Sequence, residues 1–141
     1  MATDIYIGTY IQAPRFDGVL RISPAVGTEL VDSGVNAGTG RAARWFQQSV
    51  NDLSRYGRDY PMIAVDGVIG TSTLDAYRSL EKKRGRIKAC ELTLKLMDSY
   101  QAAHYAKLAQ SKANASFIVG WLDHRIGNVP PSRCAETVGE G

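Results

Sequence analysis

TGRAARWFQQSVNDLSRYGRDYPMIAVDGVIGTSTLDAYRSL, residues 39–80, is the stretch that decides the fold. In its first half, four apolar residues are spaced four, four and three apart and so share one helix face: Ala42, Phe46, Val50 and Leu53. This spacing predicts an amphipathic helix over about residues 40–56, with Thr39 as its N-cap and Gly57 in the left-handed position after its end. Three amide side chains fall outside the stripe and are expected to face elsewhere: Gln47, Gln48 and Asn51.

The second half carries a glycine-rich turn with the pattern DGxxGxxT over residues 66–73. Gly67 and Gly70 lie where a turn favours residues without a Cβ, and the hydroxyls of residues 71–73 can cap the helix that follows. The connection over residues 58–70 is long for a helix–helix link, which predicts a packed loop or a small hairpin-like excursion. Its expected inward contacts are Ile63, Val65, Val68 and Ile69.

The turn itself is open to two interpretations. Its polar groups can form a ligand site, or they can serve the geometry of the turn alone. Set against the flanking helices, the pattern fits better as a structural marker, in which four residues shape the turn: Asp66, Gly67, Gly70 and Thr73.

Two helices are predicted upstream of this stretch. Residues 3–12 place aromatic and apolar side chains on neighbouring turns, which suits a short helix. The segment PRFDG follows and is predicted to be a loop, with Phe16 as its apolar anchor. Ser23 and Pro24 combine a hydroxyl N-cap with a proline in the first turn, a typical helix start, and this helix is expected to end near Gly38.

Three more helices are predicted downstream, over about residues 72–80, 86–110 and 115–126. The second of them has so broad an apolar surface that it belongs in the centre of a bundle. Its main stripe includes Ile87, Cys90, Leu94 and Met97. The last helix is expected to turn four residues inward: Phe117, Ile118, Trp121 and Leu122. No strand pattern of any length occurs, so the predicted fold class is all-α.

The composition is that of one globular domain. The chain has 141 residues, of which 44% are hydrophobic and 22% charged, with a formal net charge of +3. Cys90 falls inside a predicted helix and Cys134 in a Gly/Pro-rich tail, so a disulfide framework is not indicated. His104 and His124 stand apart from any cysteine or carboxylate cluster of ligand spacing, and neither a metal site nor a cofactor is predicted.

One basic run, Glu81-Lys82-Lys83-Arg84-Gly85-Arg86, interrupts an otherwise even spread of charge. It can contact an anionic polymer such as DNA, teichoic acid or a membrane surface, or it can be a solvated junction between two helices. No aromatic residue is interleaved with it, which disfavours nucleic acid as a partner. The sequence has no signal peptide and no apolar stretch of membrane-spanning length, so synthesis in the cytoplasm is expected.

No catalytic set is evident from the residues. A glycosidase needs carboxyl groups flanking the scissile bond, at least one of them kept protonated by an apolar pocket. Glu29 is expected to point outward, Glu81 lies among lysines and Glu91 flanks the long helix, so none has the surroundings of a general acid. Cys90 is predicted to be inert core, and no nucleophile elbow or phosphate loop occurs.

Five short sequence motifs follow one another along about residues 5–126. They are Ile5-Tyr6 with Tyr10, DSGVNAG (32–38), RAARWFQ (41–47), VDGVIGTSTL (65–74) and GWLDHR (120–125). Together they resemble the C-terminal two-thirds of phage-type N-acetylmuramidases of glycoside hydrolase family 108. The resemblance includes the part that this family calls its predicted peptidoglycan-binding domain.

The resemblance implies a lysozyme-like helical bundle that lacks its N-terminal catalytic segment. Residues 1–38 correspond to a remnant of the catalytic region, residues 39–128 to the peptidoglycan-binding helical domain and residues 129–141 to a flexible tail. The family's catalytic glutamate lies in a Glu-Gly-Gly-Tyr motif that this sequence does not contain, so no catalytic residue is predicted. The polymer-facing residues that the resemblance implies are Tyr10, Asp32 and Asn36.

Three functions are compatible with the resemblance. The first is a peptidoglycan-associated module of phage or prophage origin, a truncated endolysin that binds glycan without cleaving it alone. The second is an active muramidase whose general acid comes from another chain or a missed upstream start, and the third is a structural protein of a phage or secretion system. Peptidoglycan is the expected partner, and a homodimer or a separate catalytic chain would cover apolar surface exposed by truncation. The expected place of action is the cell wall or periplasm, reached through a holin or a similar route.

Overall fold

The computed structural model describes residues 2–136, and the regular elements in this part of the chain are all helices. The α-helices are α1 (Ala2–Ile7), α2 (Phe16–Ile22), α3 (Pro24–Ala37), α4 (Thr39–Leu53), α5 (Thr71–Arg84), α6 (Arg86–Leu108) and α7 (Ile118–Arg125). The π-helix η1 (Gly8–Gln12) follows α1, and two 3-10 helices flank α7: η2 (Ala115–Phe117) and η3 (Pro131–Ala135). The all-α prediction is confirmed.

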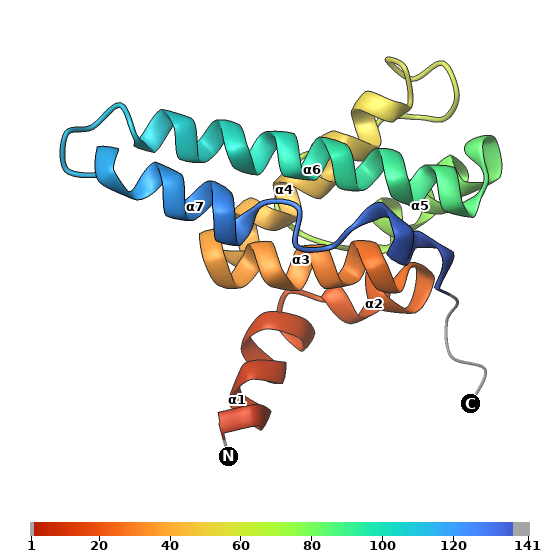
Figure 1. Ribbon diagram of the computed structural model, residues 1–141. Coiled ribbons are helices and arrows are strands. Elements are labelled where there is room, and N and C mark those ends of the chain that lie inside the picture. The colour runs from red at the N-terminus through yellow and green to blue at the C-terminus, as the bar shows by residue number, and fades with distance from the viewer. Residues whose placement is uncertain (1, 137–141) are drawn as a thin grey trace.

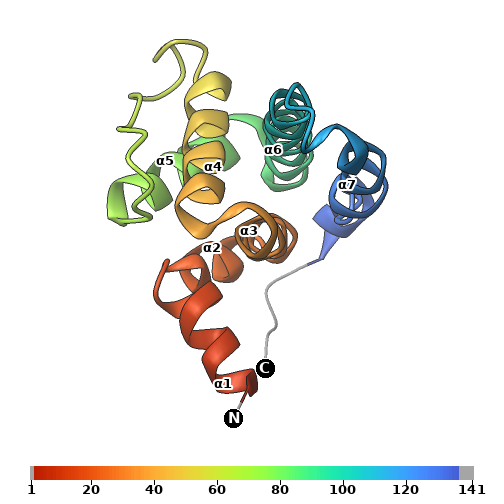
Figure 2. The ribbon, with the colours of Figure 1, turned by 90° about the vertical axis from the view of Figure 1, so that its left-hand side faces the viewer.

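Helix α6 is the centre of the bundle. It packs against α3, α4, α5 and α7, and also against η3 near the C-terminus. Figure 1 shows α6 and α7 side by side and antiparallel, with α3 below them, and Figure 2 shows the same helices nearly end-on. In both views α1 projects away from the bundle. The predicted long central helix is therefore confirmed.

The apolar stripe of α4 lies in the middle of the core, as predicted. Ala42, Phe46 and Val50 are fully buried, and the Phe46 ring lies 5.5 Å from the ring of Tyr77 on α5. Helix α4 packs against α3, α6 and α5, and burial of an apolar face of this kind contributes most of the stability of a helix in a protein. Two of the neighbouring amides, Gln47 and Asn51, face the loop after α4 and not the stripe, and this loop buries both of them.

Glycines, rather than hydroxyl residues, precede α4 and α5. Gly38, at a φ of 98°, is the N-cap of α4, and Gly70 is the N-cap of α5, and neither helix has a side-chain cap. The capping roles predicted for Thr39 and for residues 71–73 are therefore wrong. By contrast, Ser23 caps α3 as predicted, because its Oγ accepts from the Val26 N–H at 3.4 Å.

Helix α2 occupies residues that the sequence predicts to be a loop. Phe16 is fully buried, as expected of an apolar anchor, but it begins a helix. Gly18 allows α2 to approach α5, because a Cβ at this position would lie 3.1 Å from Cδ1 of Leu74. The segment is short and contains a glycine, so its local helix propensity is weak and packing on the bundle decides its conformation.

Several residues predicted to face inward are exposed. On α7, Phe117 at its start and Leu122 are 53% and 43% exposed, while Trp121 is half-buried against the ring of Tyr105 on α6. Helix α7 lies at the rim of the bundle and covers only one side of α6, so only one of its faces is needed for packing. The other exposed residues of this group are Val65, Val68 and Ile87.

A disulfide joins Cys90 of α6 to Cys134 of η3, although no disulfide framework is indicated by the sequence. The two cysteines are 44 residues apart in sequence, and only the packing of η3 on α6 brings their Cα atoms to 5.6 Å. Both side chains are buried, and so is Val129, within the segment predicted to be a flexible tail. This segment packs on the bundle as far as residue 136, and the rest of the predicted tail, 137–141, lies outside the described residues.

Loss of the disulfide is expected to destabilise the fold. In Cys134→Ala, the free energy of unfolding should fall by about 2–4 kcal/mol, because the unfolded chain gains the freedom of a long open loop. Equilibrium unfolding in urea measures this change. A reductant should bring the wild type to the level of the variant and leave the variant unchanged. Equal stability of reduced and oxidised wild type would show that the disulfide contributes nothing.

Candidate functional site

A buried amide of α4, Gln47, holds the glycine-rich turn. The two hydrogens of its Nε2 are shared among Asp66 Oδ1 at 3.0 Å, the Val68 carbonyl at 2.9 Å and Thr73 Oγ1 at 3.1 Å. Its Oε1 accepts from the backbone N–H groups of Asp66 at 3.1 Å and Gly67 at 2.9 Å. One side chain thus supplies the hydrogen bonds that a turn without a neighbouring strand would otherwise make with water.

The turn is tightened by its own residues as well. Asp66 Oδ1 accepts from the Val68 N–H at 2.9 Å, and this bond together with the one from Gln47 lowers the pKa of the Asp66 carboxyl. Gly67 has a φ of 81°, and a Cβ there would lie 3.3 Å from the Gly40 carbonyl oxygen. Of the residues singled out from the DGxxGxxT pattern, Asp66 and Gly67 lie in the turn against α4, Gly70 is the N-cap of α5, and Thr73 bonds Gln47 from the first turn of α5.

Asn51, one helical turn after Gln47, holds the start of the same loop. Its Nδ2 donates to the Ile63 carbonyl and its Oδ1 accepts from the Ile63 N–H, both at 2.8 Å. The Tyr60 hydroxyl donates to the Val50 carbonyl at 2.6 Å, which fixes the buried ring of Tyr60 against α4. The segment 60–63 is thus tied to α4 at both of its ends.

A groove runs between this segment and α5, and we call it the α5 groove. It consists of two adjoining hollows of about 340 and 380 Å³, which share Tyr60, Pro61 and Ser79 as lining residues. One wall is the segment 60–63, which offers mostly apolar side chains. The other wall is a polar stripe along α5: Ser72, Asp75, Ser79, Lys82 and Lys83.

The polar stripe follows from helical spacing. Ser72, Asp75 and Ser79 follow one another at spacings of three and four residues, and Lys82 and Lys83 come three and four residues after Ser79. These residues therefore share one face of α5, while Tyr77 and Leu80 point into the core from the other. The groove therefore has one apolar wall, one wall of hydroxyls and charges, an acidic residue towards one end and two lysines at the other. Such a surface suits an elongated polar ligand with apolar groups on one side.

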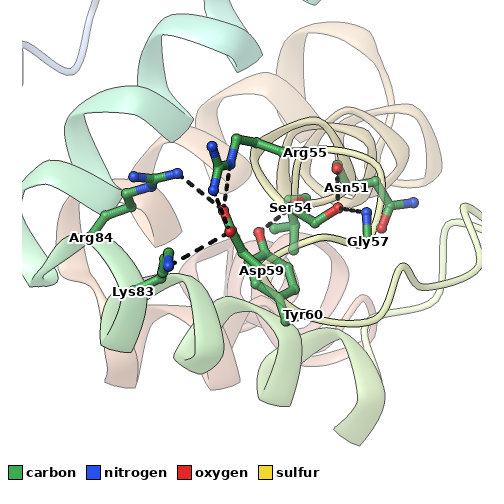
Figure 3. A network of polar contacts seen from close by, with 9 residues as sticks. Asn51, Ser54, Arg55, Gly57, Asp59, Tyr60, Lys83 and Arg84 are labelled. Carbon is green, nitrogen blue, oxygen red and sulfur yellow. Dashed lines mark hydrogen bonds and ion pairs between the residues drawn. The ribbon is translucent and has the colours of Figure 1, made fainter.

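The lysine end of the groove is anchored by a buried carboxylate, Asp59, whose side chain is 1% exposed. Figure 3 shows three cationic side chains converging on it, from Arg55, Lys83 and Arg84. Arg55 donates two hydrogen bonds, at 2.9 and 2.7 Å, Arg84 donates one at 3.0 Å, and Lys83 Nζ lies 3.8 Å away. The bonds from Arg55 and the surrounding positive charge lower the pKa of Asp59 to about 2.

The three residues implied by the family resemblance lie outside this groove. Asp32 lines a smaller hollow of about 240 Å³ between η1, α2 and α3, together with Tyr6, whose ring lies 5.1 Å from that of Tyr10. The Asp32 carboxylate accepts from Asn128 at 3.2 Å. The carbonyl of Asn36 accepts from Arg125 at 3.5 Å, and Asn36 does not line the hollow. The structure thus places Tyr10 beside Tyr6, which lines the same hollow as Asp32, and the role of Tyr10, Asp32 and Asn36 in binding stays a prediction.

A second polar cluster is buried between α3 and α6, and it overturns the expectation for Glu29. This side chain is 1% exposed instead of pointing outward. Ser33 Oγ lies 2.8 Å from Glu29 Oε2 and 3.2 Å from Gln101 Oε1, and Gln101 Nε2 donates to the Tyr105 hydroxyl at 2.8 Å. A continuous series of polar side chains therefore connects α3 to α6 inside the core.

Burial and the nearby Asp98 carboxylate raise the pKa of Glu29 to about 8, and burial also raises the pKa of Asp98. Burial raises the pKa of Glu81 too. The inference that no glutamate has the surroundings of a general acid is therefore wrong for Glu29, whose buried surroundings favour the protonated carboxyl. However, a general acid must touch the leaving oxygen, and Glu29 is closed off from any ligand in this structure. In the described part of the chain, no three His, Cys, Asp or Glu side chains are placed to hold a metal ion.

Sequence reasoning missed the roles of the buried amides, although a signal for them exists. Gln47 and Asn51 are four residues apart and so share a helix face, and the residues that follow form a long loop with few partners of its own. Two amides on one face beside such a loop are well suited to replace its backbone partners. For Glu29, no comparable signal occurs in the sequence, because its burial depends on the packing of α3 against the distant helix α6, whose Asp98 lies beside it.

A family model described as "Predicted Peptidoglycan domain" matches residues 41–126, which is more than half of the chain. The match begins in α4 and ends just after α7, so it contains the glycine-rich turn, the amides that hold it and the whole lining of the α5 groove. No curated protein matches the chain. Among the described residues, no helix is both long enough and apolar enough to cross a bilayer.

Proposed function

Because the chain belongs to the family of predicted peptidoglycan domains over residues 41–126, we propose that it binds peptidoglycan in the α5 groove. The observation that carries this proposal is the position of the groove, whose lining residues all fall within the matched segment. Two further hollows, of about 270 and 240 Å³, are lined partly or wholly by residues before position 41. The groove is thus a concave surface that lies entirely within the family's own part of the chain.

The chemistry of the groove fits the polymer. Peptidoglycan consists of amino sugars with acetyl methyl groups and hydroxyls, and it carries short peptides with charged ends. The apolar segment 60–63 can cover methyl groups and sugar faces, while Ser72 and Ser79 can exchange hydrogen bonds with hydroxyl and amide groups. The wall is held in place before a ligand arrives, because Asn51 and Val50 anchor it, and preorganisation of this kind favours binding.

We also propose that the chain binds this polymer without cleaving it by itself. The carboxyl groups that line the groove are Asp59 and Asp75. Asp59 is unsuited to donate a proton as a general acid, because three cationic side chains keep its pKa low. Glu29 has a raised pKa but lies buried outside the groove. The resemblance to phage-type N-acetylmuramidases supports a more specific proposal, a module derived from an endolysin whose catalytic glutamate has no counterpart in residues 1–141.

The disulfide supports a place of action outside the reducing cytoplasm. Disulfides persist in oxidising compartments such as the periplasm and the cell surface, and thiols are kept reduced in most bacterial cytoplasms. The buried pair Cys90–Cys134 closes the C-terminal segment onto α6. We therefore propose that the protein works at the cell wall.

Sedimentation with purified peptidoglycan sacculi tests the binding. The wild type is expected to pellet with sacculi, and Ser79→Trp is expected to pellet much less, because the indole would fill the groove. Ser99→Trp on α6 is the matched control, since both serines donate to the carbonyl four residues earlier: Asp75 for Ser79 and Lys95 for Ser99.

Three results would count against the proposal. Wild type that pellets no more than an unrelated protein would refute binding to peptidoglycan. Equal pelleting of the wild type and Ser79→Trp would exclude the α5 groove as the site. Loss of turbidity in a suspension of permeabilised cells treated with the protein alone would refute the absence of cleavage.

A further inference from the structure

The two ends of the α5 groove carry opposite charges. Asp75 lies towards one end and, among the described residues, its one ion pair is with Arg78, at 3.8 Å, with both side chains more than half exposed. Lys82 and Lys83 line the other end. A neutral glycan strand has no group that needs either charge, so the charges point to the charged part of peptidoglycan.

The lysine end has positive charge in excess. The single carboxylate of Asp59 faces Arg55, Lys83 and Arg84, and the two arginines already occupy both of its oxygens. The Lys83 Nζ therefore lies 3.8 Å from Asp59 Oδ1, and the Lys83 side chain is 46% exposed. Lys82 is exposed beside it and forms no ion pair within the part of the chain that the structure describes. An anionic group that enters this end of the groove gains two ammonium partners without displacing Asp59.

The distance between the charged ends matches a short peptide. Asp75 and Lys82 are seven residues apart on α5, which corresponds to about 10 Å along the helix axis at about 1.5 Å per residue. An extended chain advances about 3.3–3.6 Å per residue, so one peptide residue together with the extended side chain of a diamino acid can span the two ends. Between them, Ser79 offers a hydroxyl and Pro61 and Met62 an apolar wall.

We propose that the α5 groove binds the stem peptide of peptidoglycan, with a peptide carboxylate at Lys82 and Lys83 and the free amine of its diamino acid at Asp75. This inference rests on the proposed function and names the part of the polymer that is recognised. A nucleic acid or a teichoic acid fits less well, because a uniform polyanion would meet Asp75 at one end of the groove and an apolar wall along its length.

Competition experiments on sacculus binding test the inference. A synthetic tetrapeptide of stem sequence should release the wild type from sacculi, whereas its C-terminal amide and an N-acetylglucosamine tetramer should release it much less. Lys82→Glu should weaken tetrapeptide binding about fivefold to tenfold in calorimetry. Lys112→Glu makes the same charge change in the loop that joins α6 to α7, far from α5 in Figure 1, and should bind as the wild type does. Lys82→Gln serves as the test if Lys82→Glu fails to fold.

A second pair of variants tests the amine contact. Asp75→Asn should weaken binding of the tetrapeptide but not of an analogue in which the side-chain amine of the diamino acid is acetylated. Asp123→Asn, an exposed residue on α7, is its control. A loss that is equal for both ligands would overturn the assignment of the amine to Asp75.

The outcomes separate this inference from the proposed function. If the wild type pellets with sacculi but is released by the sugar tetramer and not by the tetrapeptide, the stem-peptide inference is overturned and peptidoglycan binding stands. Release by DNA or teichoic acid at the same charge concentration as the peptide, or equal losses in Lys82→Glu and Lys112→Glu, would also overturn it. A wild type that does not pellet at all would overturn both.

Discussion

Gln47→Ala is expected to lower the free energy of unfolding by about 3–5 kcal/mol, although it removes an uncharged side chain. The substitution leaves the backbone N–H groups of Asp66 and Gly67, the Val68 carbonyl and the Thr73 hydroxyl without their partner. Each buried polar group left unpaired costs about 1–3 kcal/mol, and water can reach some of these groups because the turn is partly exposed. Equilibrium unfolding in urea measures the change.

Gln48→Ala is the control for this substitution. Gln48 is the next residue on the same helix, and it is half-buried and donates a solvent-exposed hydrogen bond to Asp52 at 2.9 Å. Its loss should change stability by less than about 0.5 kcal/mol. Equal effects of the two substitutions would show that the network around Gln47 is not what holds the turn.

The same substitution should affect binding. Gln47 holds the part of the loop next to the segment 60–63, which forms the apolar wall of the α5 groove. In folded Gln47→Ala, the wall is therefore less well held, and sacculus binding should weaken. Stability and recognition thus depend on the same amide.

Glu29→Gln is expected to stabilise the protein at alkaline pH by up to about 5 kcal/mol and to have little effect near pH 4. Burial and the Asp98 and Asp32 carboxylates raise the pKa of Glu29 from 4.5 to about 8. Between these two values the folded protein keeps a proton that the unfolded chain releases, so the stability of the wild type falls as pH rises and levels off above about 8. Glutamine resembles the protonated form at every pH and removes this loss.

The measurement is the free energy of unfolding from pH 4 to pH 9 for both proteins, and the difference between the two curves isolates Glu29. Ser33→Ala is the control, because it removes the 2.8 Å hydrogen bond to Glu29 but keeps the carboxyl group. It should be less stable than the wild type and should retain the fall with pH. Parallel curves for Glu29→Gln and the wild type would mean that Glu29 does not titrate in this range.

The α5 groove follows from a short series of local requirements. The loop after α4 contains no strand, so its backbone needs side-chain partners, and Gln47 and Asn51 supply them from one helix face. This fixes residues 60–63 beside α5, whose outer face then carries hydroxyls and charges where an apolar stripe would have closed the gap. The groove is thus a consequence of how the loop is held.

Helical periodicity was sufficient to predict most of the helices. The stripe of α4, the serine–proline start of α3 and the broad apolar surface of α6 are local patterns, and each produced the expected helix. Helix α2 could not be predicted in this way, because a segment of seven residues with a glycine has no strong preference of its own.

The sequence by itself determined the all-α fold, the central helix α6, the amphipathic α4 and the residues of the glycine-rich turn, because spacing along one segment is sufficient for each. Only the tertiary structure decided which polar groups are buried. Gln47 and Asn51 are covered by a loop, Glu29 is covered by α6, and Cys90 meets Cys134 from 44 residues away. The same holds for the α5 groove, whose two walls come from different segments. Burial and juxtaposition depend on contacts between distant segments, and periodicity describes only the segment in which it occurs.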